Sequence, residues 1–357
     1  MNIGIIGLPQ TGKKTLFSLL VGKGALEHRG DPSKTARGVA EILDPRFDAL
    51  VKIYSPKKHT RARVDIILPQ KIEEHSVSTG DIFHDLAEVE VFCHVVRVFQ
   101  NDSIYHIWGS VDPIRDIDYV NTEFVLHDLI FVEKRLQRIE KDLKKIKDEH
   151  EVKERELLEK LKRHLENERP LRTLDITPDD QRLIASYPLL SAREMIVVLN
   201  VGDSDVKDAA RASEIASRYA ALRIGCVQVA VEMEAEIAAL ESDEEKRAFM
   251  QEMGLEDTAL HILTGQCIRA LGLLSFFTVA SAEVRQWFVR RGATAVEAAG
   301  KIHTDLARGF IRAEVIGFDD LERLGTEEKV KSAGKLGVKG RDYVVEDGDI
   351  LFIRFSV

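Results

Sequence analysis

Cysteine is scarce in this sequence of 357 residues, and its three cysteines, Cys93, Cys226 and Cys267, lie far apart. No two of them form a C-x-x-C pair, so the spacing of a disulfide framework or of a cysteine-bound metal site is missing. We expect them to be thiols packed in the interior of a protein from a reducing compartment, the cytoplasm. The cysteines therefore give no reason to expect a metal centre.

Long hydrophobic runs and an excess of positive charge are missing too. The N-terminal stretch IGIIGL is too short to cross a bilayer, and it lacks the basic start and apolar body of a signal peptide. The net charge of −9 argues against nucleic-acid binding over the whole surface, although it leaves room for a local basic patch. We expect a cytoplasmic protein that binds neither membranes nor DNA.

The residues that are present describe a soluble protein of two or three domains, with 44% hydrophobic and 31% charged residues. Five short aliphatic runs predict strands, and helical stretches separate most of them. Strands that alternate with helices favour an α/β fold with a parallel sheet covered on both faces. The predicted strands are at residues 1–8, 62–68, 89–98, 194–201 and 223–231.

This alternation stops near residue 119, where a different periodicity begins. Aliphatic residues recur at spacings of three and four, the seam of a coiled coil, and two antiparallel helices are the simplest interpretation. Their charged faces are either solvated or the surface of a partner-binding arm. Thr177, Pro178 and Asp180 then predict a new helix start with a capping box. The seam residues are Leu129, Val132, Leu136, Ile139, Leu143, Ile146, Leu158, Leu161 and Leu165.

The stretch GLPQTGKKT follows the first predicted strand and opens a helix. It fits the phosphate-binding pattern G-x-x-x-x-G-K-[ST], except that Lys14 replaces the hydroxyl residue. In such a loop, backbone N–H groups and a helix N-terminus surround the phosphates, and Lys13 reaches the terminal ones. The predicted phosphate-binding residues are Gly7, Pro9, Gln10, Thr11, Gly12, Lys13, Lys14 and Thr15.

Lys14 makes a role for Mg²⁺ doubtful. A hydroxyl at this position normally binds the metal, and a protonated lysine cannot. Thr15 is one residue further, about 100° around the helix, so it does not simply substitute. Lys14 either replaces part of the metal's charge or points to solvent, and both interpretations stay open.

Several longer stretches resemble the YchF subfamily of Obg-like ATPases. They are GLPQTGKKTLF, DPRFDAL, HVVRVFQNDSIYHIWGSVDPIRDIDYVNTEF, AGKIHTDLARGFIRAEVIGFDDL and AGKLGVKGRDYVVEDGDILFIRFSV. The resemblance implies a P-loop nucleotide-binding G domain over 1–118 and 174–273, a helical hairpin inserted at 119–173, and a β-grasp TGS domain at 274–357. It also implies binding and hydrolysis of ATP, often in preference to GTP, and association with ribosomes.

The chain departs from this family at its switches. The family motif D-I-A-G is matched by DIIL, which keeps Asp65 and puts Leu68 where a glycine senses the γ-phosphate. The glycine-rich switch that follows is replaced at residues 71–82. The first switch is shortened, and Ser33 or Thr35 could stand in for its metal-binding threonine.

Two further site predictions depend on the same resemblance. Asn200, Val201 and Asp203 match the base-reading motif, with the base left open and adenine slightly favoured; the alternative is an ordinary turn after a strand. His106 matches the family's water-positioning histidine, and a plain surface-loop histidine is the alternative.

In the C-terminal part, Trp287, Arg290 and Arg291 form a candidate RNA contact for a ribosomal partner. A packed strand with a basic end explains them equally well.

The sequence therefore predicts a protein that binds ATP or GTP, with hydrolysis that is weak or lost. The alternative, from another functional class, is a nucleotide-independent scaffold that uses its TGS domain and coiled-coil arm to bind RNA or protein.

Overall fold

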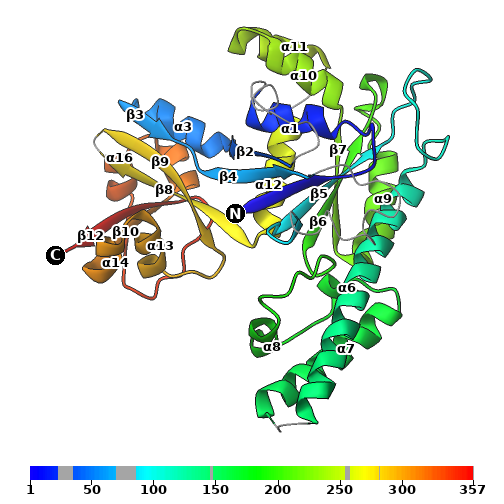
Figure 1. Cartoon of the computed structure of the whole chain (residues 1–357). Helices are drawn as coiled ribbons and strands as arrows, with labels where there is room; N and C mark the ends of the chain where they lie inside the picture. Colours follow the sequence, from blue (N-terminus) through cyan, green and yellow to red (C-terminus); the bar gives the residue numbers. More distant parts are fainter. Residues whose placement is uncertain (23–34, 70–85, 145–147, 254–257, 281, 357) are drawn as a thin grey trace. The chain divides into compact units, whose positions relative to one another are not determined.

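The computed structural model describes residues 1–22, 35–69, 86–144, 148–253, 258–280 and 282–356 (Figure 1). The chain forms two compact units, one of residues 1–40 and 65–263 and the other of residues 41–64 and 264–357. Within the described residues, each unit contains a six-stranded sheet. No helix of these residues is long and apolar enough to cross a membrane.

The first sheet has the strand order β2-β4-β1-β5-β6-β7. The pairs that β1 forms with β4 and β5, and those that β6 forms with β5 and β7, are all parallel. Every residue of β5 is buried, as expected for a parallel strand covered on both faces. The five predicted strands and the α/β class are thus confirmed, and β2 is an addition. The bounds are β1 (Asn2–Ile6), β2 (Ala36–Glu41), β4 (Arg63–Leu68), β5 (Val91–Arg97), β6 (Glu194–Asn200) and β7 (Ile224–Val229).

Helices cover this sheet, and the longest begins there. Ile117, Val120 and Phe124 of α6 pack into the core of the sheet, with the rings of Phe124 and Phe92 4.9 Å apart. The helices are α1 (Lys13–Val21), α6 (Pro113–Leu143), α7 (Glu149–Glu166), α8 (Pro178–Leu183), α9 (Ala210–Tyr219), α10 (Val231–Ala239), α11 (Asp243–Met253) and α12 (Ala259–Ala270), with short 3-10 helices at Leu171–Thr173, Asp203–Asp205 and Ala220–Leu222.

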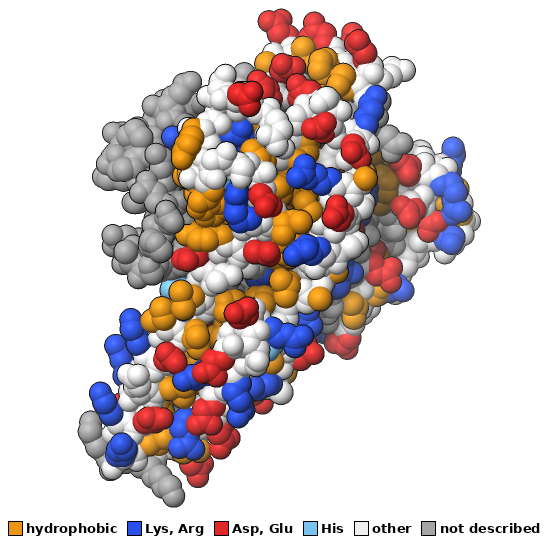
Figure 2. Space-filling view, turned by 90° about the vertical axis from the view of Figure 1, so that its right-hand side faces the viewer, with side chains coloured by type: hydrophobic (Ala, Val, Ile, Leu, Met, Phe, Trp, Pro, Cys, Tyr) orange, Lys and Arg blue, Asp and Glu red, His pale blue; other side chains and the backbone are white. Residues whose placement is uncertain are grey.

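The predicted hairpin is formed by the second half of α6 and by α7, which run side by side (Figure 1). Ion pairs join Glu133 to Lys162 and Arg135 to Glu154, so the two helices are antiparallel. The seam residues described by the structure lie in one buried cluster, and Ile146 lies outside the described residues. In the lower part of Figure 2, charged side chains of both signs are interspersed on the arm, as on a solvated surface.

The start of α8 matches its prediction in detail. Thr177 is the N-cap, Pro178 opens the helix, and the side chains of Thr177 and Asp180 form a reciprocal capping box. This short helix follows the hairpin and returns the chain to β6. The local sequence was sufficient to predict the start of this helix, because a capping box depends on residues only three positions apart.

The second unit is built on a mixed sheet with the order β11-β10-β12-β8-β9-β3. β12 pairs with β8 in parallel, whereas β10 with β12 and β8 with β9 are antiparallel. The elements are α3 (Pro45–Tyr54), β3 (Lys58–Thr60), β8 (Leu273–Ala280), β9 (Glu283–Arg290), α13 (Ala295–Ile302), α14 (Thr304–Arg308), β10 (Phe310–Gly317), α15 (Phe318–Leu324), α16 (Glu327–Ser332), β11 (Gly337–Lys339) and β12 (Asp349–Phe355).

Residues 41–64 belong to this second unit, although the sequence placed them in the G domain. Phe47 and Leu50 of α3 are fully buried in a cluster that includes Phe277 and Ile350. β3 adds a parallel strand beside β9, with Lys58 opposite Glu283. The apolar face of α3 is therefore covered by residues more than two hundred positions later in the chain. Local periodicity predicts that such a face is buried, but it does not predict which residues cover it.

Candidate nucleotide-binding site

The loop Gly7–Thr15 connects β1 to α1 at the carboxyl end of β1. Gly7 and Gly12 have φ of 142° and 96°, and Gln10 also has a positive φ, 61°. A Cβ atom on Gly7 would lie 2.3 Å from the carbonyl oxygen of Val95, and one on Gly12 would lie 2.4 Å from Nδ2 of Asn200. The two glycines of the motif are thus required by conformation and by close packing.

Lys13 bends back over this loop. Its Nζ donates a hydrogen bond to the carbonyl oxygen of Leu8, and the Thr11 hydroxyl donates to the same oxygen at 3.1 Å. Gly12 is the N-cap of α1 and has no side chain, so no side-chain cap stands at the start of this helix. A half-buried ammonium and the N-terminus of a helix therefore meet at one loop, an arrangement suited to an anion.

Asn200 ties the loop to the rest of the site. It is 5% exposed at the end of β6, its Nδ2 donates to the carbonyl oxygen of Thr11 at 3.0 Å, and its Oδ1 accepts from the N–H of Val231 at 3.2 Å. Val201 is buried beside it, while Asp203 is exposed in the 3-10 helix that follows. Of the three predicted base-reading residues, the structure thus joins Asn200 to the phosphate loop by a hydrogen bond.

The structure does not bring Asp65 to this loop. Asp65 pairs with Asn2, at the amino end of β1, whereas the loop follows the carboxyl end. Its side chain is 60% exposed and lies 3.7 Å from the N-terminal ammonium. Asp65 thus lies away from the loop in this structure, and the end of β4 nearer the loop carries Leu68, which is buried. Ser33 and residues 71–82 lie outside the described residues, and Thr35 immediately precedes β2.

In the described part of this loop, the side chain that follows Lys13 supplies no oxygen ligand for Mg²⁺. Lys14 and Thr15 are both exposed, and Lys14 offers a cation where a metal needs an oxygen ligand. In the described ranges, no three His, Cys, Asp or Glu side chains are grouped so as to hold a metal ion. We therefore derive no step that uses a metal.

His106 lies in the loop between β5 and α6 and is 5% exposed. Its Nε2 is 3.0 Å from Oδ2 of Asp116, and its Nδ1 accepts from the N–H of Trp108 at 3.3 Å. Arg115 donates to the other oxygen of Asp116 and lies 4.7 Å from the centre of the Trp108 ring. His106 is therefore a buried, paired histidine rather than a plain surface residue.

Two residues of β5, Arg97 and His94, were not predicted as site residues. Arg97 is 2% exposed, and it donates to the carbonyl oxygens of Phe99, Asn101 and Ile104 at 3.2, 3.0 and 2.9 Å. Burial lowers its pKa. His94 is fully buried, and burial together with the charge of Lys13 lowers its pKa to about 3. The available signal was a charged residue at the carboxyl end of an apolar strand, the end at which parallel sheets bind ligands.

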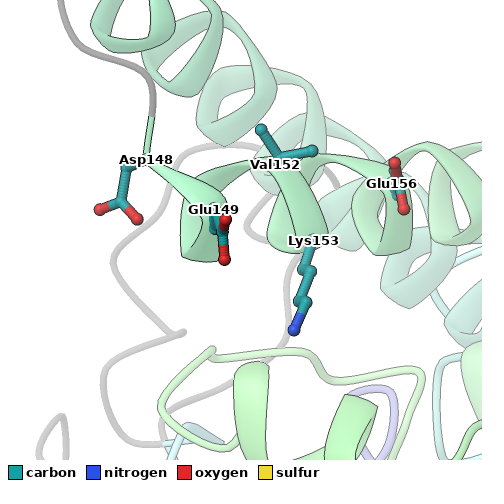
Figure 3. A pocket seen from close by; sticks show the side chains of 5 residues that line it. All are labelled: Asp148, Glu149, Val152, Lys153 and Glu156. Carbon is teal, nitrogen blue, oxygen red and sulfur yellow. The ribbon is translucent and has the colours of Figure 1, made fainter.

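Elsewhere, a hollow of about 490 Å³ lies at the start of α7 (Figure 3). The described residues that line it include three carboxylates, from Asp148, Glu149 and Glu156, and one ammonium, from Lys153. Carboxylates repel phosphate, so this hollow does not suit a nucleotide.

A parallel α/β sheet with this strand order, and a glycine loop that presents a lysine and a helix N-terminus, define a P-loop protein with a G-domain fold. Comparison with known proteins identifies the family to which this P-loop protein belongs. The chain is 38% identical to "Ribosome-binding ATPase YchF" of Bacillus subtilis (strain 168) over 100% of both chains. It is 33% identical to "Obg-like ATPase 1" of Oryza sativa subsp. japonica over 100% of this chain and 92% of that relative. The chain belongs to the YchF family.

Structural comparison agrees with the sequence relatives. The solved structure of the YchF GTPase of Schizosaccharomyces pombe has a TM-score of 0.83 and 28% identity, covering 99% of this chain and 97% of that one. A model of the family YchF-GTPase_C, described as "Protein of unknown function (DUF933)", matches residues 273–356.

Proposed function

We propose that this protein binds ATP or GTP, with the phosphates on the loop Gly7–Thr15 and the base near Asn200, Val201 and Asp203. The observation that supports it most is the loop itself, where Lys13 and the N-terminus of α1 meet and Asn200 holds Thr11 in place. Relatives named as ATPases and a solved relative named as a GTPase support the same ligand class.

We further propose that hydrolysis is slow. Phosphoryl transfer relies on a metal that bridges the β- and γ-phosphates and on a positioned water. Lys14 stands where a metal-binding hydroxyl is needed, and the carboxyl end of β4 carries the apolar Leu68. The charge of Lys14 can offset phosphate repulsion but cannot supply octahedral coordination.

Changing Lys13→Ala is expected to weaken nucleotide binding by about 1–3 kcal/mol, roughly five- to 150-fold, because one partner of charge-assisted hydrogen bonds is lost. Equilibrium titration with fluorescent ATP and GTP analogues measures this change. Lys141→Ala, an exposed lysine on the arm, is the matched control and should leave affinity unchanged.

Two outcomes would change the proposal. Unchanged affinity in Lys13→Ala would remove this lysine from the site. If the wild-type protein bound no nucleotide at millimolar concentration, the nucleotide-independent scaffold would be the better description. Repeating the titration without Mg²⁺ should change the affinity little, and a strong Mg²⁺ requirement would contradict our interpretation of Lys14.

We also propose that the second unit contacts ribosomal RNA, which would place the protein in the cytoplasm. The names of several relatives include ribosome binding. Arg290 and Arg291 are exposed at the end of β9. Trp287 is half-buried, donates from Nε1 to the Thr278 hydroxyl at 2.9 Å, and has Arg285 4.0 Å above its ring. The two exposed arginines are thus the better RNA contacts, since a base could stack on Trp287 only after Arg285 moved.

Reversing both charges, Arg290→Glu with Arg291→Glu, is expected to abolish co-sedimentation with ribosomes. In the wild-type protein, association should weaken as salt rises, because phosphate contacts release counterions. The double reversal Arg308→Glu with Arg323→Glu changes the net charge equally, at exposed sites of the same unit. An RNA contact at Arg290 and Arg291 would be ruled out if both double variants sedimented like the wild type.

A further inference from the structure

The hydrogen bonds of His106 define where its proton lies. The backbone N–H of Trp108 is a donor, so Nδ1, 3.3 Å away, must be the acceptor. The proton of a neutral ring is therefore on Nε2, which donates to Oδ2 of Asp116 at 3.0 Å. Asp116 thus selects one of the two neutral tautomers of the imidazole.

Asp116 is itself held firmly. It lies in the first turn of α6, is 1% exposed, and accepts on Oδ1 from Nε and Nη2 of Arg115 at 3.1 and 2.9 Å. One oxygen of its carboxylate is thus occupied by Arg115, and the other is left for His106. A carboxylate fixed in this way can hold the ring in one orientation and stabilise an imidazolium.

The loop that carries His106 is also tied to the nucleotide site. The N–H groups of Val98 and Phe99 donate to the carbonyl oxygen of Asn200 at 2.8 and 3.2 Å, and the side chain of Asn200 holds Thr11. Arg97 fixes the first half of the same loop through three backbone carbonyls. A change in the phosphate loop can therefore reach this segment through contiguous hydrogen bonds.

We propose that Asp116 is a positioning residue for His106, which it holds with Nδ1 as the nitrogen available to a water molecule. Nδ1 accepts from Trp108 in this structure, so the proposal requires that the water take the place of this N–H, whose 3.3 Å bond is the longest of those around His106 and Asp116. In hydrolysis, the water oxygen bonds to the terminal phosphorus as the bond from that phosphorus to the bridging oxygen breaks. Nδ1 takes the water proton, and the products are nucleoside diphosphate and inorganic phosphate. This inference rests on the proposed nucleotide binding.

The tautomer can be measured without turnover. In ¹⁵N-labelled wild-type protein, the NMR signature of the neutral form of the His106 ring should place its proton on Nε2, assigned by comparison with His106→Gln. Asp116→Asn can place an amide donor against the ring, so it should lose that signature. A wild-type ring with its proton on Nδ1 would overturn the proposal, whether or not Asp116→Asn folds.

Single-turnover hydrolysis tests the functional role. Asp116→Asn should reduce the rate by about tenfold or more, the lower part of the range for general-base catalysis, while nucleotide affinity stays unchanged. Asp112→Asn is the matched control, since Asp112 caps the start of α6 and asparagine caps helices as well as aspartate does. An unchanged rate in Asp116→Asn, or a wild type that binds nucleotide without turnover, would refute the positioning role and leave nucleotide binding intact. If no nucleotide bound at all, the proposed function would fail as well.

Discussion

Replacing Gly12 with alanine is expected to abolish detectable nucleotide binding, a loss of at least about a hundredfold. The backbone of Gly12 has φ of 96°, and a Cβ atom there would lie 2.4 Å from Nδ2 of Asn200. The side chain of Asn200 would have to move, which breaks its bond to Thr11, and the strained backbone adds roughly 1–3 kcal/mol. Titration with fluorescent nucleotide analogues measures the loss.

Gly22→Ala is a matched control at the other end of α1. Gly22 also has a positive φ, 107°, but none of the residues that the structure describes lies within 4 Å of the position that its Cβ would take. This variant should be less stable than the wild type and should still bind nucleotide. If both variants bound equally well, the close packing of Gly12 against Asn200 would not matter to the site.

His94 is expected to make the stability of the first unit depend on pH. Its pKa in the folded protein is about 3, whereas an unfolded histidine has a pKa of about 6.5. Between these values, the unfolded chain binds a proton that the folded chain does not. The free energy of unfolding should therefore fall as pH decreases from about 6.5 towards 3, by about 1.4 kcal/mol per pH unit from this residue.

Urea denaturation of the wild type and of His94→Leu, followed by circular dichroism at pH 7, 6 and 5, measures this contribution. The difference in stability between the two proteins should change by about 0.7 kcal/mol from pH 7 to 6 and by about 1.2 kcal/mol from pH 6 to 5. His303→Gln removes an exposed histidine of the second unit and should show the wild-type slope. Equal slopes for the wild type and His94→Leu would mean that His94 titrates alike in both states.

The phosphate loop and the hairpin seam could be predicted because each depends on nearby residues. Gly7, Gly12 and Lys13 stand within one turn and one helix start, and the seam repeats every three or four residues. The prediction for Asp65 also depended on nearby residues alone. The sequence around Asp65 matches the family motif. In the structure, however, β4 continues to Leu68, so Asp65 lies opposite Asn2 at the amino end of β1.

The environment of His106 could not be predicted from the sequence. The histidine itself was found through the family resemblance, but its pairing with Asp116 depends on how a loop folds back onto the first turn of α6. Arg97 looks like the end of a strand until the carbonyl groups of the following loop are seen around it. Such contacts come from tertiary structure, and no local pattern encodes them.

The membership of residues 41–64 in the second unit has a consequence for the order of events during synthesis. Phe47 and Leu50 leave the ribosome about 230 to 300 residues before Phe277 and Ile350, their partners in the core. At a translation rate of about 5–20 residues per second, these side chains remain for roughly 10–60 s without the surface that covers them. During that interval the nascent chain exposes an apolar segment between two strands of the first sheet, where chaperones have time to act.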